Sequence, residues 1–508
     1  MQDRPRNVVL IMTDQQRADS LGCLGHPAVR TPHLDRLAAR GAVMRNHITP
    51  HQICAPSRGT LFSGLYARHH GLTRNGIALP PDLPLLSHLL QAAGRRTHGV
   101  GKFHFQPILA AADLQMPESN AFWATPAAEG WRGPFYGFDS VDLVIGESVE
   151  STVGGHYARW LSDRAPGAAA LYAPENALAP PPPDLEEVWK SAIPEALHYN
   201  TWIGERACAF LDGTGGDPFF LLVSFPDPHH PFSPPRPWCD MYDPADMPPP
   251  RAEPGELDAM PGYLRAGDEA GKSYVDYLRD PGPPREQGFM MPTRQISARS
   301  LSMAMAHTCG MISMIDAVAG RILGRLNDLG LTEDTLVVFT SDHGEFLGDH
   351  GLLRKGPPPY RQLLQVPLLV AGPGVVPGGR RQMTSHVDLR RTLAAMVGVE
   401  AGPDDGQDFS AVLRDPAAAG RSHLHAEYHP RVDAETYNQT LITEDWRLTV
   451  YPNRPGWGEF FDRRADPGEH RNLWADAGLV PVRTAMAATL QQEFPAAPAA
   501  GGEVLAVY

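Results

Sequence analysis

Short runs of apolar residues, rich in β-branched side chains, recur along the first 400 residues and predict buried strands. They occur at residues 7–12, 97–100, 219–225, 335–339 and 366–370. Amphipathic stretches typical of helices separate them, at residues 33–40, 85–93, 201–211 and 298–329. Strands that are apolar on both faces and alternate with helices are typical of a parallel sheet covered on both sides. We therefore expect an α/β fold built on a large, mostly parallel sheet flanked by helices.

Two segments interrupt this pattern. Residues 164–184 are rich in Ala and Pro, and residues 231–293 are rich in Pro and Gly. Both compositions predict long surface segments. Such segments are either irregular connections or, at the active edge of an α/β sheet, the wall or lid of a pocket. The sequence favours neither interpretation.

The pattern changes again after about residue 400. Short apolar runs at 441–443, 446–451 and 458–461, separated by turns, predict antiparallel strands, and a helix is expected over 481–494. We therefore expect two units. Residues 1–400 would form the α/β domain, and residues 401–508 a smaller C-terminal α+β subdomain with an antiparallel sheet.

The composition is that of an ordinary globular protein. Of 508 residues, 42% are apolar and 20% are charged, and the net charge is −14. An acidic chain offers no basic surface to nucleic acid, and no apolar run approaches the length of a membrane span. We expect neither nucleic acid nor a membrane as a partner, and a homo-oligomer stays an open alternative.

The N-terminal strand leaves no room for a secretory signal, which needs a charged start and a longer apolar run before the fold begins. The five cysteines are odd in number and scattered, so they do not suggest a disulfide framework. We therefore expect a cytoplasmic protein.

Polar residues follow four of the predicted strands directly. Ligands of doubly wound sheets bind beyond the carboxyl ends of the strands, so these residues are expected to meet at one edge. One polar turn residue after an apolar run is common, but four such positions together indicate a site. The residues are Asp14 and Gln15, Lys102 and His104, His229 and His230, and Asp342 and His343.

Part of this set has the chemistry of a metal site. Asp14 and Asp342 supply carboxylate oxygens, Gln15 an amide oxygen and His343 an imidazole nitrogen. Such a set can hold one divalent cation and leave room for a substrate oxygen. Taken alone, an Asp-Gln pair after a strand is more often a helix N-cap.

Residues 52–65 read Gln-Ile-Cys-Ala-Pro-Ser-Arg-Gly-Thr-Leu-Phe-Ser-Gly-Leu and centre on Cys54. Pro56 suits the first turn of a helix, whose N-terminal N–H groups would face an anion. A lone cysteine is otherwise most often a small buried apolar residue.

The Cys-x-Pro-Ser-Arg run resembles the signature of the type I sulfatases, members of the alkaline phosphatase superfamily. The resemblance implies that a formylglycine-generating enzyme oxidises Cys54 to formylglycine. One hydroxyl of the hydrated aldehyde would attack sulfur and the other would later expel sulfate, which divides a hard step into two easier ones. Leu65 departs from the family, which often has a basic residue there.

Two further motifs resemble the metal motifs of that family, Met12-Thr-Asp-Gln and Thr340-Ser-Asp-His-Gly-Glu. They imply an alkaline phosphatase-like fold and one metal ion. Calcium is the family default, and the imidazole makes manganese a competitor. The implied ligands are Asp14, Gln15, Cys54, Asp342 and His343.

The remaining cationic and polar residues match family motifs as well. Arg58 would anchor the aldehyde hydrate. In Gly-Lys-x-His, Lys102 would contact the sulfate and His104 would help the hydrate collapse. His229 would protonate the leaving alcohol, with His230 as second choice.

Two more residues complete the implied site. Lys355, in Leu353-Arg-Lys-Gly, resembles the lysine that bridges sulfate and leaving group. Asn75 stands where relatives that hydrolyse phosphonate esters use an asparagine to contact the substrate; it could equally be a turn residue.

We therefore expect a hydrolase that cleaves a small-molecule sulfate ester and whose alcohol half the sequence does not reveal. The first alternative is a phosphonate monoester or phosphodiester hydrolase, which shares the cysteine motif and both metal pairs but is not expected to carry Lys-x-His. The second is a catalytically inactive relative that serves in binding. The full set of polar residues argues against it.

Overall fold

The computed structural model describes residues 4–262, 290–430, 434–496 and 502–506. Their largest element is an eight-stranded sheet in the order β10-β2-β9-β7-β1-β5-β3-β4. Its strands are β1 Asn7–Thr13, β2 Ala42–Ile48, β3 Arg96–Gly101, β4 Ser140–Leu143, β5 Phe219–Ser224, β7 Thr335–Ser341, β9 Leu368–Ala371 and β10 Gly378–Ser385.

The sheet is mostly parallel, as predicted. Strand β1 lies between β5 and β7 and runs parallel to both. Strand β9 runs antiparallel to β2 and β7, so the sheet is mixed at this one place. The carboxyl ends of the parallel strands therefore gather at one edge, which is where the predicted polar residues lie.

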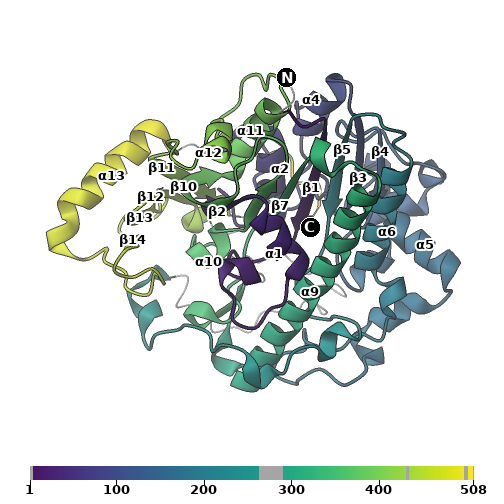
Figure 1. Ribbon diagram of the computed structural model, residues 1–508. Coiled ribbons are helices and arrows are strands. Elements are labelled where there is room, and N and C mark those ends of the chain that lie inside the picture. The colour runs from purple at the N-terminus through teal and green to yellow at the C-terminus, as the bar shows by residue number, and fades with distance from the viewer. Residues whose placement is uncertain (1–3, 263–289, 431–433, 497–501, 507–508) are drawn as a thin grey trace.

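Helices cover both faces of the sheet (Figure 1). The helices of the described residues are α1 Pro32–Ala39, α2 Cys54–Ser63, α3 Ala67–His70, α4 Leu86–Ala92, α5 Gly155–Arg164, α6 Tyr199–Asp212, α9 Ala298–Asp328, α10 Arg361–Leu364, α11 Leu389–Met396, α12 Ser410–Arg414 and α13 Val480–Glu493. Helices α1, α6 and α9 share one hydrophobic cluster, and α2, α4 and α11 share another.

Strand β1 explains why both faces are apolar. Val9 and Ile11 belong to the cluster with α9, whereas Val8, Leu10 and Met12 belong to the cluster with α2. Successive side chains of a strand point to opposite faces, so a strand between two helical layers must be apolar at every position.

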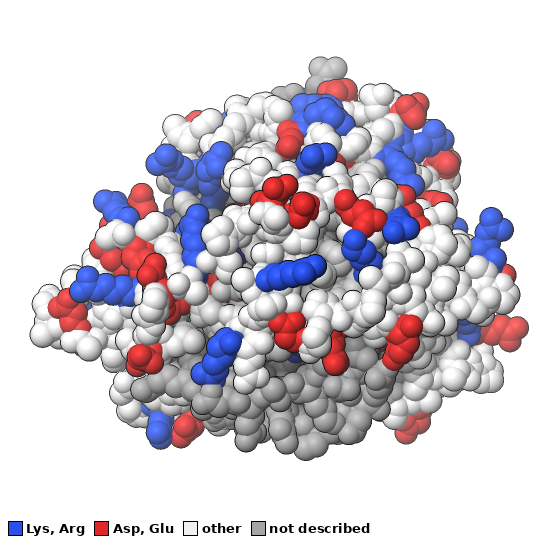
Figure 2. All heavy atoms as spheres, turned by 90° about the horizontal axis from the view of Figure 1, so that it is seen from below, with Lys and Arg blue, Asp and Glu red and all other residues white. Residues whose placement is uncertain are grey.

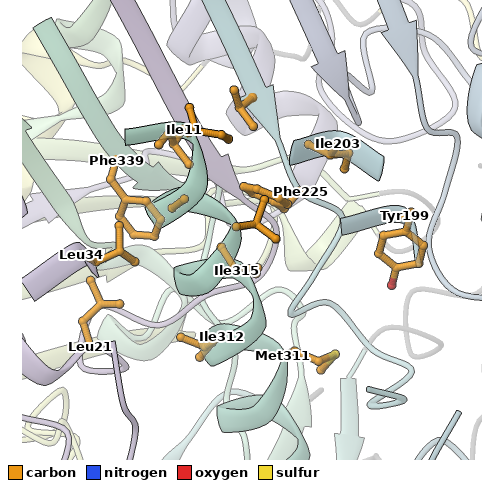
Figure 3. Close-up of a cluster of buried hydrophobic side chains, with 14 of the residues drawn as sticks. Ile11, Leu21, Leu34, Tyr199, Ile203, Phe225, Met311, Ile312, Ile315 and Phe339 are labelled. Atoms are coloured by element: carbon orange, nitrogen blue, oxygen red, sulfur yellow. The ribbon is translucent and has the colours of Figure 1, made fainter. Parts of the chain in front are cut away.

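Helix α9 is the longest described helix and lies across the sheet with its apolar side inward. Figure 3 shows Met311, Ile312 and Ile315 of α9 among the side chains of one buried cluster, which also includes Ile11 and Phe339 of the strands. By length and composition alone this helix could cross a membrane, but 83% of its apolar window is buried inside the structure. The core helix of a globular protein shows the same pattern.

The C-terminal strands form a separate antiparallel sheet at one end of the molecule, with α13 packed on it (Figure 1). Its strands are β11 His423–Tyr428, β12 Asn438–Thr443, β13 Trp446–Val450 and β14 Gly458–Asp462. The predicted antiparallel sheet and final helix are therefore confirmed. The boundary at residue 400 stays a prediction.

The strands that the sequence pattern missed are mostly polar or short. Strands β2, β10 and β11 mix charged residues or histidines with apolar ones, and β4 has four residues. A further short pair joins β6 Met290–Pro292 to β8 Leu352–Arg354. A strand that is buried on only one face, at a sheet edge or under a loop, needs few apolar residues. The sequence pattern therefore does not reveal it as a strand.

The two predicted surface segments differ from each other. Residues 164–184 pack on the core through Tyr172, whose hydroxyl is 2.7 Å from that of Tyr157 and whose ring stacks on Tyr199. Residues 263–289 of the second segment lie outside the described residues. Before them, Phe232, Tyr242 and Met247 pack in the cluster with α9, and Met260 packs with Phe461 of β14. Figure 2 shows basic and acidic side chains interspersed on the face it presents, with no broad patch of one sign among the described residues there.

Candidate active site

Cys54 is the first residue of α2 and is fully buried. The backbone at Ile53 is extended and provides no side-chain cap, so the N-terminal N–H groups of the helix are available for other acceptors. One of them, on Ala55, donates to Asn75 Oδ1 at 3.2 Å. Pro56 lies in the first turn, where its missing N–H costs no helical hydrogen bond.

Three side chains from different elements surround the sulfur atom. Lys355 Nζ lies 2.8 Å from Cys54 Sγ, His343 Nε2 lies 3.2 Å away and Asp14 Oδ1 lies 3.6 Å away. Asp14 follows β1, His343 follows β7 and Lys355 follows β8. The parallel strands β1 and β7, together with the segment that follows β8, thus bring together residues that are separated by up to 341 positions in the chain.

The residues predicted to hold a metal fit one. Asp14, Cys54, Asp342 and His343 each offer a ligand atom within 4.8 Å of the others. The amide nitrogen of Gln15 contacts Glu345 and donates to His230 Nδ1, which leaves Gln15 Oε1 buried without a hydrogen-bond partner among the described residues. Such an atom needs a positive partner, since a buried acceptor without one is unfavourable.

The imidazole of His343 is prepared for ligation. Its Nδ1–H donates to the Gly344 carbonyl at 2.8 Å, which leaves the lone pair of Nε2 facing Cys54. A hydrogen bond of this kind fixes the tautomer of a metal-binding histidine. Burial, and then the charge of Lys355, lower the pKa of His343 to about 4, so the ring is neutral.

Arg58 joins the two carboxylates of the candidate metal site. Its guanidinium donates to Asp342 Oδ2 at 2.8 Å, to Asp14 Oδ2 at 3.3 Å and to Ser224 Oγ at 2.9 Å. It also donates to the carbonyl of Lys102. The structure therefore gives Arg58 a positioning contact with both ligands, in addition to the positive charge that the sequence motif implied.

Lys102 contacts the same carboxylate oxygen of Asp14 as Arg58 does. Its Nζ is 2.8 Å from Asp14 Oδ2 and 2.8 Å from Glu147 Oε2. Burial disfavours its charge, but the two carboxylates outweigh burial and raise the pKa of Lys102 well above its usual value. Gly101 before it has φ of +103°, and an added Cβ would meet the Ser224 carbonyl at 1.8 Å, so only glycine fits here.

His104 and Gln15 both adopt left-handed backbone conformations just beyond their strands, with φ of 59° and 65°. Non-glycine residues in this region are uncommon and often occur at functional sites. The backbone N–H of His104 donates to Glu118. Burial, then Lys102 and Arg58, lower the pKa of the His104 ring, which is therefore neutral.

His229 and Lys355 form a coupled pair. Lys355 Nζ lies 3.0 Å from His229 Nε2, and His229 Nδ1 lies 2.5 Å from the His230 carbonyl and 3.2 Å from Glu147 Oε1. Burial, followed by Lys355, lowers the pKa of His229 well below its usual value. The ring of His230 stacks on that of His229 at 4.1 Å and contacts Gln15.

The structure brings all the predicted residues into one region and adds residues that the sequence did not reveal. Glu147 accepts a hydrogen bond from Lys102 and contacts His229, and Glu345 accepts a hydrogen bond from Gln15. Burial raises the pKa of Glu345 to about 7. Glu147 follows the short edge strand β4, which has too little apolar character to be recognised. Glu345 lies within the second metal motif and could have been chosen from it.

Comparison with known proteins agrees with the geometry. The family model described as Sulfatase matches residues 6–399, and the model described as N-sulphoglucosamine sulphohydrolase, C-terminal, matches residues 348–495. An arylsulfatase of Clostridium perfringens is 26% identical over 92% of this chain and 90% of its own length. The multifunctional alkaline phosphatase superfamily protein PehA of Trinickia caryophylli is 29% identical over 93% and 91%.

A solved structure gives the same picture of the fold. The phosphonate monoester hydrolase of Agrobacterium radiobacter superposes with a TM-score of 0.77 at 25% identity, covering 96% of this chain and 95% of the other. Enzymes of the sulfatase family generally use a metal ion and formylglycine, and the buried ligand group around Cys54 agrees with that. Because the sulfatase model matches most of the chain, this protein belongs to the sulfatase family of the alkaline phosphatase superfamily and is a sulfatase-type enzyme.

Proposed function

We propose that this enzyme hydrolyses small-molecule sulfate esters by means of a formylglycine at position 54 and one divalent metal. The observation that carries the proposal is the position of Cys54, at the N-terminus of α2 between a candidate metal site and two buried lysines. This arrangement suits a covalent step on an anionic ester.

The metal would be held by Asp14, Gln15, Asp342 and His343, with residue 54 beside it. Three oxygens and one nitrogen suit calcium, with manganese as the competitor. The metal would supply positive charge that favours ionisation of an attacking hydroxyl. The modified side chain, made by a formylglycine-generating enzyme, would supply that hydroxyl from a hydrated aldehyde.

The protein itself supplies a balanced set of buried charges. Lys102, Lys355 and Arg58 are cationic, and each is at most 1% exposed. Asp14, Asp342 and Glu147 hold Arg58 and Lys102 in place through direct contacts, whereas Lys355 contacts Cys54, His229 and His343. Preorganised charges in a site without water stabilise a transition state at no cost of reorganisation. Lys102 beside Asp14 and Lys355 beside Cys54 would contact the sulfate oxygens.

His229 is the candidate acid for the leaving alcohol. In this structure its ring is neutral and Nε2 faces the ammonium of Lys355. Lys355 is therefore the nearest source of the proton that the alcohol must take up, and His229 would pass it on or position it. General acid catalysis of this kind contributes about 10²–10⁴-fold.

We expect His229→Ala to lower kcat by about 10²–10⁴-fold for sulfate esters of poorly acidic alcohols, and much less for esters of acidic phenols. A leaving group that departs without protonation needs no acid. The measurement is the dependence of kcat/KM on leaving-group pKa in wild type and variant, with His423→Ala at the surface as control. An equal loss for all esters would contradict the acid role.

The second candidate function is phosphonate monoester hydrolysis. It is favoured by Asn75, whose Oδ1 accepts from the backbone beside Cys54 and whose Nδ2 is buried without a partner among the described residues. It is also favoured by the likeness to the Agrobacterium hydrolase. Against it, Lys102 and His104 both lie in the site, and a phosphonate would direct an apolar substituent at a desolvated lysine.

The test of the proposed function is a comparison of matched aryl sulfate and aryl phosphonate esters on formylglycine-containing enzyme. We expect wild type to prefer the sulfate. In Lys102→Ala, kcat/KM for the sulfate should fall by about 10²–10³-fold, so that the preference weakens or inverts. Lys190→Ala is the matched control, because Lys190 pairs with Asp240 at the surface. A wild type that strongly favours the phosphonate would support the second candidate.

A further inference from the structure

Three segments that lie far apart in the sequence meet at a second cluster of possible metal ligands. Glu256 comes from the Pro- and Gly-rich segment, His350 from the loop before β8, and His470 from the turn after β14. Glu256 Oε1 lies 3.3 Å from His350 Nδ1, and Glu256 Oε2 lies 2.7 Å from His470 Nδ1. All three ligand atoms lie within 4.8 Å of one another.

The His350 ring is held rigidly at this position. Its backbone has φ of 59°, its N–H donates to the Arg251 carbonyl at 2.8 Å, and its ring stacks on Tyr360 at 3.9 Å between centroids. The side chain is completely buried, yet neither Nδ1, the atom that faces Glu256, nor Nε2 makes a hydrogen bond among the described residues. A buried imidazole without a full set of partners is unfavourable unless another group satisfies it.

We propose that Glu256, His350 and His470 bind a zinc ion. Two imidazole nitrogens and one carboxylate oxygen are a ligand set that zinc takes in proteins, with water as the fourth ligand. Ligands of a tetrahedral zinc site lie about 3.3 Å apart, given zinc–ligand distances of about 2.0–2.2 Å. The separation of His350 and Glu256 matches this, and a small shift of His470 would complete the site.

The surroundings provide both charge and access. The Glu256 carboxylate lies between the two imidazoles, with one oxygen facing each ring, and supplies the negative charge of the site. The His470 side chain is 18% exposed, whereas that of His350 is 0% exposed. The ion would therefore enter from the His470 side and keep its water there.

The zinc ion would link the C-terminal subdomain to the segment between His350 and Lys355, which leads into the active site. His350 lies five residues before Lys355, and the apolar residues around the cluster include Phe346 and Tyr360 of the α/β domain and Phe461 of β14. The ion would thus tie together three irregular segments without touching the catalytic ligands. This inference does not depend on which ester the enzyme hydrolyses.

A third histidine cluster offers a matched control. His423 Nε2 lies 2.6 Å from Glu493 Oε2, but His425 Nε2 lies 3.8 Å from it, and the Glu493 side chain is 44% exposed. This cluster has the same residue types in a looser, more solvated arrangement. It is expected to hold zinc weakly or not at all.

The experiment counts zinc bound per chain after chelation and dialysis against zinc chloride with calcium in excess. The experiment compares wild type with His470→Asn, Glu256→Gln and His423→Asn. The readout is the difference in zinc per chain between each variant and wild type. Zinc bound at the catalytic ligands is common to all four proteins and does not contribute to this difference. We expect His470→Asn and Glu256→Gln to bind one zinc fewer than wild type, and His423→Asn to bind the same number. Zinc should raise Tm for wild type and His423→Asn but not for the other two.

Unchanged zinc content in both His470→Asn and Glu256→Gln would overturn the proposal and show that Glu256 only bridges two histidines by hydrogen bonds. A zinc loss in His423→Asn alone would place the ion elsewhere and overturn it too. His470 is partly exposed, and its replacement by asparagine is expected to leave the circular dichroism spectrum unchanged. The readouts are metal content and Tm, so failure of the sulfatase assignment would not affect them.

Discussion

Replacing Cys54 with alanine is expected to lower kcat for sulfate ester hydrolysis by about 10⁵-fold or more, with little change in the fold. Loss of a nucleophile in a preorganised site has an effect of this size, because the remaining charges bind the ester but cannot open a covalent route. The measurement is turnover of an aryl sulfate by wild type and Cys54→Ala, purified from the same host. Cys208→Ala is the control, since Cys208 lies on α6 away from the site.

The protein with an unmodified Cys54 is also expected to be inactive, because its thiol is a poor nucleophile. Burial, reinforced by Asp14, raises the pKa of the Cys54 thiol to about 12, so the thiolate is scarce at neutral pH. Enzyme made in a host without the modifying machinery should therefore be inactive although it is folded. Peptide mass spectrometry of active enzyme should show an aldehyde at residue 54. Full activity of a protein with only unmodified cysteine there would exclude the proposed route.

The second large effect is expected from Asp342→Asn. Asp342 accepts from Arg58 and from the backbone N–H of Gln15, so it both carries charge and orders its neighbours. Asparagine keeps the shape but removes the negative charge, which should weaken metal binding strongly and lower turnover by about 10³-fold or more. Metal content by mass spectrometry and kcat at saturating calcium measure the two effects.

Alanine at position 342 is a poorer test, because it would leave the Arg58 guanidinium buried with one carboxylate fewer. Breaking a buried ion pair costs about 3–5 kcal/mol, so stability and catalysis would change together. Asp240→Asn at the surface controls for the loss of one charge. A variant Asp342→Asn that keeps its metal and most of its activity would show that the metal lies elsewhere.

The sequence was most informative for strands that are buried on both faces, because such burial requires apolar residues. A strand between two helical layers must be apolar at every position, and β1, β5 and β7 are recognisable for that reason. The polar residues after these strands, Asp14 and Asp342 among them, interrupt continuous apolar runs. Both the fold class and most of the candidate site could therefore be read without a structure.

Other features needed the tertiary structure because they depend on contacts between distant residues. Nothing in the sequence distinguishes Glu147 from other glutamates. Its position after β4 brings it into contact with Lys102 and His229. The neutral state of His229 follows from burial beside Lys355, and no local pattern indicates it. Edge strands such as β10 are half-exposed and carry charged residues, so periodicity does not reveal them.

The sequence by itself determined the nucleophile motif, the polar residues that directly follow the central strands, and the family resemblance. Each of these depends on residues that are close together in the chain. Only the tertiary structure decided which charges neutralise one another around Cys54 and that Gln15 Oε1 is left for a cation. It alone placed Glu256, His350 and His470 together. Electrostatic and coordination chemistry act through space over a few ångströms, and chain order does not specify those distances.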